Sequence, residues 1–296
     1  MRVFWNETGV SIGAPAKVNL FLELLGKRAD GFHELATLMV GLSLRDTLSF
    51  VDRADGAVTL AIDRTDLSAG PDNLIVKAAN LLRSASGVRR GASIRLAKRI
   101  PMAAGLAGGS TDAAATLIGL NRLWNAGLSN SDLTRLAAEL GSDVAFFLSL
   151  PAAWCTGRGE IVEPLPVPRA FDLVLVFPPF GCNTGGVYRN TVLPSVAETG
   201  EAVRQAFAAG DVAELSRTLH NRLEAAAEVV APPLKALREA IARVAPLGCR
   251  MSGSGSTLFA LTHDVAEAKK LTARLRSLPE LAGCRFQAVR TLKSPT

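Results

Sequence analysis

The residues best suited to do chemistry lie in a glycine-rich segment, Pro101–Thr111, which reads PMAAGLAGGST. Its glycines let backbone N–H groups approach a ligand closely, because no Cβ stands in the way. A helix-forming run follows at once, and a helix N-terminus offers free N–H donors and partial positive charge to an anion. Ser110 and Thr111 add hydroxyls for a phosphate or its metal. The segment therefore predicts a phosphate-binding loop, and the alternative is an ordinary turn in which Ser110 caps the helix.

The spacing of this loop excludes two common nucleotide motifs. No Lys-Ser or Lys-Thr pair follows the last glycine, so it is not a Walker A loop, and the pattern G-x-G-x-x-G is absent. A second segment rich in Gly and Ser, Met251–Thr257 (MSGSGST), lies between apolar residues. By itself it is equally consistent with a hairpin turn. Two such loops in one chain strengthen the prediction of a phosphate site.

The elements that must position these loops alternate between strands and helices. Apolar residues at every second position from Val18 to Leu24 predict a half-buried strand. Asp72 is expected to cap a helix, and Ser129 with Asp132 has capping-box spacing. Further strands are predicted at 46–51, 57–62, 92–97, 152–156 and 172–177; further helices at 199–209, 211–227 and 232–244, then strand, helix and strand to about 290. This order favours an α+β fold, with a boundary near residue 160 between domains 1–160 and 161–296.

The composition limits the classes of function. The chain has 296 residues with 48% hydrophobic content, and it contains neither an apolar run of membrane-spanning length nor an apolar leader. We therefore expect a cytoplasmic protein that binds no membrane. The cysteines are far apart and are expected to be buried free thiols; they are Cys155, Cys182, Cys249 and Cys284.

The net charge of +6 raises the alternative of a nucleic-acid-binding protein. Basic residues are mixed with acidic ones along the chain, and aromatic residues are only 5% of it. The excess charge is better interpreted as a mild attraction for anionic substrates. The alternative predicts tight, steeply salt-dependent RNA binding.

Three segments in this order resemble motifs of the GHMP kinase superfamily: APAKVNLFLELLGKRADGFHEL at 14–35, PMAAGLAGGSTDAA at 101–114, and the 251–257 loop. The resemblance runs from about residue 14 to 290. It implies a two-domain fold with an N-terminal ATP-binding domain of ribosomal-protein-like left-handed β-α-β type and a C-terminal ferredoxin-like substrate domain. The implied cofactors are ATP and Mg²⁺. The implied ATP-binding residues are Pro101, Met102, Ala103, Ala104, Gly105, Leu106, Ala107, Gly108, Gly109, Ser110 and Thr111.

The catalytic lysine and aspartate of the superfamily match Lys17 and Asp143. A carboxylate within hydrogen-bond reach can accept the proton of a hydroxyl nucleophile. A nearby ammonium keeps that carboxylate ionised and stabilises the negative charge that develops during phosphoryl transfer. Without the resemblance, Lys17 would be an ordinary strand lysine, and Asp143 would be a helix N-cap or an acid in the first turn of a helix.

The segment at 14–35 also resembles the branch of the superfamily whose substrate is a tertiary alcohol bearing a cytidine diphosphate group. The substrate contacts implied by that branch are Asn19, Phe32, His33, Lys98, Thr184 and Tyr188. An aromatic ring could stack on cytosine, and a neutral imidazole could bond its edge. The rival is another small alcohol, such as homoserine or a mevalonate derivative. We expect a monomer or weak homodimer that binds no nucleic acid.

The chain departs from the superfamily pattern at three positions. Ala107 replaces a usual glycine, which requires a negative φ if it is to be tolerated. Thr111 replaces a serine and keeps the hydroxyl. Phe32 replaces a usual tyrosine and keeps the stacking surface, but it loses the phenol donor. We assign no function to the thirteen residues that precede Ala14.

Overall fold

The computed structural model describes residues 1–6 and 9–294. Contacts between residues divide the chain into two compact units. Unit 1 comprises residues 1–16, 44–100 and 107–150, and unit 2 comprises residues 17–43, 101–106 and 151–296. The break at residue 150 lies ten residues before the predicted boundary, and two early segments join unit 2. The chain is therefore not divided by a single cut.

Two long strands, β2 (Gly9–Lys27) and β3 (His33–Arg53), contribute residues to both units. The sequence pattern predicted only short parts of each. From position 17 to 24 every residue of β2 is buried, so the alternation of apolar and polar residues disappears where the strand is covered on both faces. Residues before Ala14, to which we assigned no function, pair in β1 and β2.

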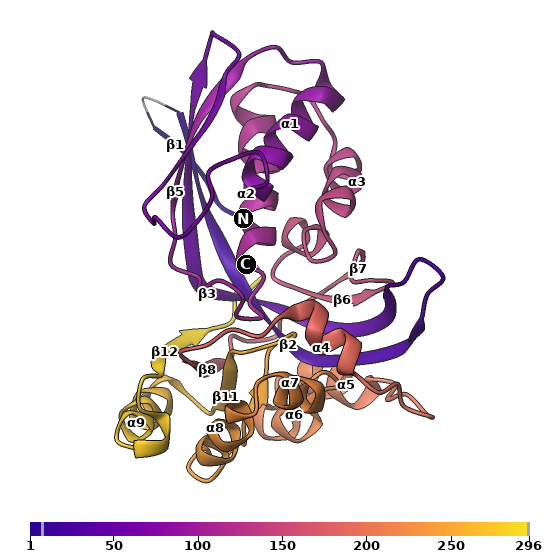
Figure 1. Ribbon diagram of the computed structural model, residues 1–296, viewed down its shortest axis with the longest axis vertical. Coiled ribbons are helices and arrows are strands. Elements are labelled where there is room, and N and C mark those ends of the chain that lie inside the picture. Colours follow the sequence, from indigo (N-terminus) through magenta and orange to yellow (C-terminus); the bar gives the residue numbers. More distant parts are fainter. Residues whose placement is uncertain (7–8, 295–296) are drawn as a thin grey trace. The chain divides into compact units, whose positions relative to one another are not determined.

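Unit 1 is a sheet covered by helices. Its other elements are β1 (Val3–Asn6), β4 (Val58–Ile62), α1 (Leu74–Ser86), β5 (Gly91–Ala97), α2 (Gly108–Leu123), α3 (Asn130–Leu140) and the short 3-10 helix η1 (Ala145–Leu148). The strand order is β1-β2-β3-β5-β4, in which β1 is antiparallel to β2, β3 is antiparallel to β5, and β4 is parallel to β5. Helices α1, α2 and α3 lie on one face of this sheet (Figure 1). The sheet and its helices thus form the layered α+β arrangement that the sequence predicted.

The helix caps of unit 1 test two predictions. The predicted capping box of α3 is confirmed, because Ser129 and Asp132 each accept a hydrogen bond from the backbone N–H of the other. The predicted cap of α1 is wrong by one residue. Asn73 is the N-cap and accepts from the backbone N–H of Ile75, whereas Asp72 accepts from the hydroxyl of Ser68. Asn and Asp are equally good caps, so composition could not choose between neighbours.

Unit 2 contains a second sheet with the order β10-β11-β8-β12. Its elements are β6 (Ala152–Thr156), β7 (Ile161–Leu165), β8 (Asp172–Phe177), α4 (Thr184–Asn190), α5 (Glu201–Ala209), α6 (Val212–Thr218), β9 (His220–Asn221), α7 (Glu224–Val230), α8 (Pro233–Ala242), β10 (Arg250–Met251), β11 (Leu258–Thr262), α9 (Val265–Arg276), η2 (Pro279–Leu281) and β12 (Arg285–Arg290). Strands β6 and β8 have the predicted bounds. The single helix predicted at 211–227 is wrong, because β9 interrupts it to pair with β2.

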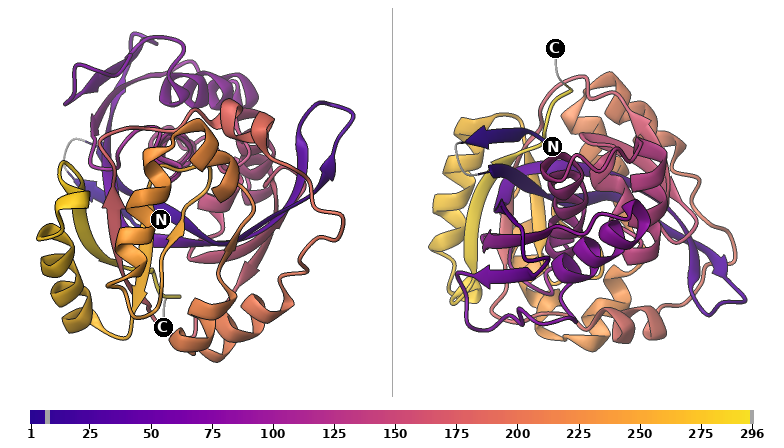
Figure 2. Two further views of the ribbon diagram at one scale, coloured as in Figure 1. Left: turned by 60° about the horizontal axis from the view of Figure 1, so that its bottom comes forward. Right: turned by 90° about the horizontal axis from the view of Figure 1, so that it is seen from above.

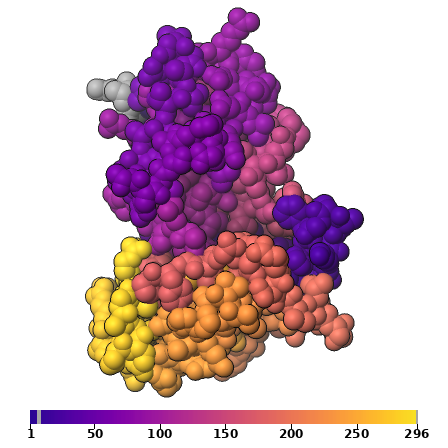
Figure 3. All heavy atoms as spheres, in the orientation of Figure 1, coloured from indigo at the N-terminus to yellow at the C-terminus, as the bar shows by residue number. Residues whose placement is uncertain are grey.

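The core of unit 2 lies between its second sheet and its helices. Leu22 and Leu24 of β2, with Val174 and Val176 of β8, are buried in one cluster with apolar residues of α7, α8 and α9. Helix α9 packs on β8, β11 and β12 and is seen beside β12 in Figure 2. The turn between β2 and β3 stands out at the surface of this unit in Figure 3. Among the described residues, no helix is long and apolar enough to cross a membrane.

Candidate active site

The predicted catalytic lysine is buried in β2 of unit 2 and is held by a chain of hydrogen bonds. Lys17 is 3% exposed, and its Nζ donates to Asn19 Oδ1 at 2.6 Å. Asn19 Nδ2 donates in turn to Thr37 Oγ1 at 2.8 Å, and the Thr37 hydroxyl donates to the carbonyl of Phe21 at 2.6 Å. These hydrogen bonds fix the orientation of the Asn19 amide. Asn19, predicted as a substrate contact, therefore also orients the lysine.

The second glycine-rich segment lies against this lysine. Gly253 has φ 56°, and a Cβ added to it would lie 3.2 Å from Lys17 Nζ and 3.4 Å from Asn19 Oδ1. Asn221 supports the loop, because its Nδ2 donates to the carbonyls of Met251 and Gly253, each at 2.8 Å. Its role could not be seen in the sequence, where it is one polar residue in a helical pattern.

The first part of the phosphate loop, residues 101–106, packs on the same segment. Ser252 Oγ donates to the Gly105 carbonyl at 2.9 Å, and the backbone N–H of Lys17 donates to the Leu106 carbonyl at 3.2 Å. A Cβ at Gly105 would lie 2.0 Å from the carbonyl oxygen of Ser252, so no larger residue fits. Parts of all three segments that carry the family resemblance thus meet within unit 2.

The second part of the phosphate loop opens α2 in unit 1. The helix begins at Gly108, and its N-cap is Ala107, whose side chain caps nothing. The N–H groups of the first turn therefore have no capping side chain, which is the arrangement that an anion site requires. The alternative in which Ser110 caps the helix is wrong. Ser110 is half-buried, whereas the Thr111 hydroxyl is fully buried and has no hydrogen-bond partner among the described residues, so Ser110 is the better placed of the two to meet a phosphate.

The expected negative φ of Ala107 is also wrong. Its φ is 54° and its ψ is 37°, in the left-handed region that disfavours a Cβ. We expect Ala107→Gly to stabilise the protein by about 1 kcal/mol, because glycine removes this strain. Urea unfolding measures the change. Ala208→Gly, at an exposed position within α5, is the control and should destabilise by about 1 kcal/mol. Equal destabilisation by both substitutions would contradict the strain at Ala107.

A buried ion cluster lies beneath the start of α2 in unit 1. Lys98 Nζ donates to Asp46 Oδ2 at 2.7 Å and to Asp112 Oδ2 at 2.5 Å, and each residue is at most 6% exposed. Burial raises the pKa of the Asp112 carboxyl to about 8, although the Lys98 charge acts in the opposite direction. Asp46 Oδ1 also accepts the backbone N–H groups of Arg99 and Ile100, at 2.5 and 2.8 Å. Lys98, predicted as a substrate contact, is therefore surrounded by carboxylates.

The predicted catalytic aspartate lies in a turn of unit 1 between α3 and η1. Asp143 is half-buried, and the next residue, Val144, is fully buried and donates its backbone N–H to the Gly141 carbonyl at 3.2 Å. Helix η1 packs against α2 and α3. Both alternatives for Asp143 are wrong, because η1 begins at Ala145 and its N-cap is Val144, so Asp143 neither caps this helix nor lies in its first turn. The turn is therefore anchored, and Asp143 itself is half-buried.

Two of the predicted substrate residues of unit 2, His33 and Tyr188, have neighbouring aromatic rings. The rings of His33 and Tyr188 are 5.4 Å apart between centroids and tilted by 32°. Burial lowers the pKa of His33, and the charge of Lys27 acts in the same direction. The imidazole is therefore neutral near pH 7, as recognition of a neutral base edge requires.

Phe32 lies in the exposed turn between β2 and β3, with 51% of its surface exposed. The Arg158 guanidinium lies over its ring, 4.9 Å from the centroid, which the sequence did not reveal. Thr184 is placed at the start of α4, where its hydroxyl is 2.9 Å from that of Ser254 in the second glycine-rich segment. Thr184 therefore contacts the second glycine-rich segment directly.

The predicted site residues divide between the units. Unit 2 holds Lys17, Asn19, Phe32, His33, Thr184, Tyr188 and residues 101–106, whereas unit 1 holds Lys98, Asp143 and residues 107–111. The residues that the sequence did not point to are Asn221, Arg158, Asp46 and Asp112. Asn221, Arg158 and Asp46 lie far from the motifs in the sequence, whereas Asp112 lies within the 101–114 motif and only its bond to Lys98 depends on the folded chain.

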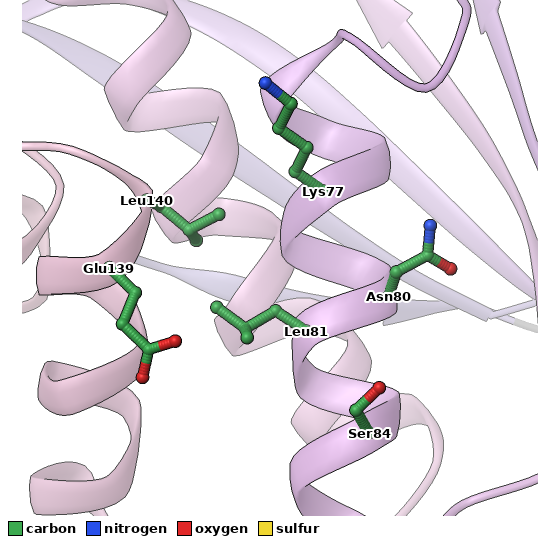
Figure 4. A pocket seen from close by; sticks show the side chains of 6 residues that line it. All are labelled: Lys77, Asn80, Leu81, Ser84, Glu139 and Leu140. Carbon is green, nitrogen blue, oxygen red and sulfur yellow. The ribbon is translucent and has the colours of Figure 1, made fainter.

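A hollow of about 390 Å³ between α1 and α3 contains none of the predicted site residues. In Figure 4, Lys77, Asn80, Leu81 and Ser84 of α1 line one side, and Glu139 and Leu140 of α3 line the other. In the described part of the chain, no group of three or more His, Cys, Asp or Glu side chains could hold a metal ion. The cysteines are free thiols as predicted, although Cys284 is only half-buried.

The fold and these loops match two domain families. The N-terminal domain of the GHMP kinases matches residues 73–149, and the C-terminal domain of the GHMP kinases matches residues 203–280. The order of the two domains and the glycine-rich loop at the start of α2 define the class as a GHMP kinase, an ATP-dependent kinase.

Comparison with individual proteins narrows the class. The chain is 45% identical over 270 residues to 4-diphosphocytidyl-2-C-methyl-D-erythritol kinase of Pelotomaculum thermopropionicum, covering 90% of this chain and 94% of that one. It is 43% identical over 292 residues to the kinase of the same name from a Synechococcus species, covering 93% and 94%. The chain therefore belongs to the family of 4-diphosphocytidyl-2-C-methyl-D-erythritol kinases.

Solved structures agree with this assignment. The crystal structure of a 4-(cytidine 5'-diphospho)-2C-methyl-D-erythritol kinase matches with a TM-score of 0.79 and 35% identity, covering 96% of this chain and all of that one. Homoserine kinase from Cytophaga hutchinsonii matches with a TM-score of 0.75 at 20% identity, covering 98% of this chain and 96% of that one. The second match supports the fold alone.

Proposed function

We propose that this chain transfers the γ-phosphoryl group of ATP to the tertiary 2-hydroxyl of 4-diphosphocytidyl-2-C-methyl-D-erythritol. The products are the 2-phosphate and ADP, in the non-mevalonate route to isoprenoid precursors. The observation that carries this proposal is the 45% identity, over 90% of the chain, to a kinase named for that substrate. Action in the cytoplasm as a monomer or weak homodimer stays a prediction.

ATP is proposed to bind at the glycine-rich segment. The uncapped N–H groups at the start of α2 suit the phosphates, and Ser110 can add its hydroxyl. Mg²⁺ prefers oxygen ligands and commonly takes only one or two from the protein. The Ser110 hydroxyl and the Asp143 carboxylate are oxygen donors of this kind that are not fully buried, so the residues fit the ion. When bound, it would neutralise charge on the phosphates.

The proposed reaction uses Asp143 and Lys17. The Asp143 carboxylate accepts the proton of the substrate 2-hydroxyl. The oxygen of that hydroxyl forms a bond to the γ-phosphorus as the bond between the γ-phosphorus and the leaving oxygen of ADP breaks. The Lys17 ammonium stabilises the charge that develops on the transferred group. Its orientation by Asn19 at 2.6 Å and its close approach to Gly253 support this role.

The cytidine group is proposed to bind near the turn between β2 and β3. Phe32 offers an exposed aromatic ring with the Arg158 guanidinium over it. The neighbouring rings of His33 and Tyr188 offer further aromatic surface. A neutral His33 can recognise the hydrogen-bonding edge of cytosine.

An ADP-release assay across candidate alcohols tests the proposal. The cytidyl substrate should be turned over, whereas homoserine and mevalonate should give only the background rate. Turnover of homoserine or mevalonate without turnover of the cytidyl substrate would show that the specific assignment is wrong. Salt-sensitive RNA binding without ATP turnover would favour the nucleic-acid alternative.

The lowered pKa of His33 predicts a pH dependence of substrate binding. His33 is neutral at pH 7 and gains a proton only below its ordinary range, because burial and Lys27 both disfavour the charge. Because the pKa of His33 is lowered from its ordinary value of 6.5, we expect KM for the cytidyl substrate to rise as the pH falls below that value. Steady-state kinetics from pH 5 to pH 8 measure this rise, and KM for ATP serves as the internal control. His33→Asn should remove this rise in KM at low pH. If the variant kept the same dependence of KM on pH, the rise would come from a group other than His33.

A further inference from the structure

The ion cluster beneath α2 is an unusual feature of a protein core. Asp46, Lys98 and Asp112 come from β3, the segment after β5, and α2, and they are 0%, 6% and 3% exposed. Burying three ionisable groups is costly, and well-packed apolar residues usually stabilise a core as well or better. The cluster therefore needs an explanation other than stability alone.

The cluster connects the two ends of the phosphate loop. On the entry side, Asp46 Oδ1 accepts the backbone N–H groups of Arg99 and Ile100, the last residues before the loop. On the exit side, Asp112 belongs to α2 and accepts from Lys98 at 2.5 Å. Lys98 also donates to Asp46 at 2.7 Å, so one ammonium joins the carboxylates that hold the two ends.

Lys98 also lies directly beneath the first residue of α2. A Cβ added to Gly108 would be 3.0 Å from Lys98 Nζ and 3.1 Å from Ile100 Cγ2. Because Ala107 provides no cap, the first turn of α2 is not held in place by its own N-terminal side chain. Lys98 therefore supports the first turn of α2 in place of a capping side chain, and the N–H groups of that turn stay available to an anion.

We propose that Lys98 is a positioning residue for nucleotide binding, which fixes the first turn of α2 through Asp112 and the entry to the loop through Asp46. This inference rests on the proposed ATP site. It differs from the expectation that Lys98 contacts the alcohol substrate, because its ammonium is already shared by two buried carboxylates.

The test compares two variants, Lys98→Met alone and Lys98→Met with Asp112→Asn. The single variant leaves two carboxylates without their cation and risks misfolding. The double variant removes Lys98 together with one of the two carboxyl groups that it bonds, and Asp46 keeps its two backbone donors. Lys77→Met, at an exposed lysine of α1 in the same unit, is the matched control. Circular dichroism and the melting temperature establish which variants are folded.

The readouts are the Kd of ATP from calorimetry without acceptor, and the two KM values. In the folded double variant, we expect Kd and KM for ATP to rise by about tenfold or more, the scale seen when supporting groups behind a binding site are removed. KM for the cytidyl substrate should stay within about twofold. Lys98→Arg, which keeps the charge, should retain part of the affinity for ATP.

Two results would overturn the inference. One is a folded double variant with unchanged affinity for ATP, and the other is a rise confined to KM for the cytidyl substrate, which would make Lys98 a substrate contact. Failure of the proposed function is seen separately. In that case, the unsubstituted protein would not turn over the cytidyl substrate, whereas the Kd of ATP would still report on Lys98.

Discussion

Asp143→Asn is expected to lower kcat by about 10²- to 10⁴-fold, the usual contribution of a general base. The amide keeps the shape of the side chain but cannot accept the proton of the substrate hydroxyl. Val144 is buried and anchors the turn, so the variant should fold normally. Steady-state kinetics at saturating ATP and cytidyl substrate measure the loss.

A matched control for this substitution is Glu139→Gln, at an exposed carboxylate near the end of α3 in the same unit. It should leave kcat within about twofold, as expected for a surface site away from the chemistry. A near-normal kcat in folded Asp143→Asn would contradict the general-base role. Equal losses in both variants would indicate a general effect of removing negative charge.

Lys17→Met is expected to lower kcat by about 10²- to 10³-fold, the scale for loss of one donor that stabilises charge in the transition state. Methionine has a similar length and suits a site that is 3% exposed, so we expect the fold to be retained. KM for the cytidyl substrate should change much less than kcat, because the ammonium acts mainly on developing charge. Single-turnover kinetics separate the chemical step from binding.

Lys235→Met, at an exposed lysine of α8 in unit 2, is the control for this variant. It should have normal kinetics. If folded Lys17→Met instead showed a raised KM with an unchanged kcat, the lysine would be a binding group and not a stabiliser of the transition state.

Most of the elements could be predicted because their patterns are local. Strands β6 and β8 have the predicted bounds, and the capping box of α3 follows from residues three apart. The long strand β2 could not be predicted as a whole, since burial on both faces removes the alternation on which the prediction depends. The break between α6 and α7 arises from pairing of β9 with β2, a contact between distant residues that no helical pattern encodes.

The candidate site shows the same division. The glycine-rich segment and the motif around Lys17 are local in sequence and could be recognised there. The left-handed conformation of Ala107 could not, because glycine, not alanine, is the usual signal for a positive φ. The supporting groups Asp46 and Asn221 lie 52 residues from Lys98 and 32 from Gly253 respectively, so only the folded chain identifies them.

Phosphorus NMR of the product formed from ATP and 4-diphosphocytidyl-2-C-methyl-D-erythritol tests the central claim most directly. We expect one new phosphomonoester resonance beside the two diphosphate resonances, together with the signals of ADP. Because the tertiary carbon bears no hydrogen, this resonance should show no splitting from a proton on the esterified carbon. A phosphomonoester split by such protons, or release of inorganic phosphate with no new ester, would contradict transfer to the tertiary 2-hydroxyl.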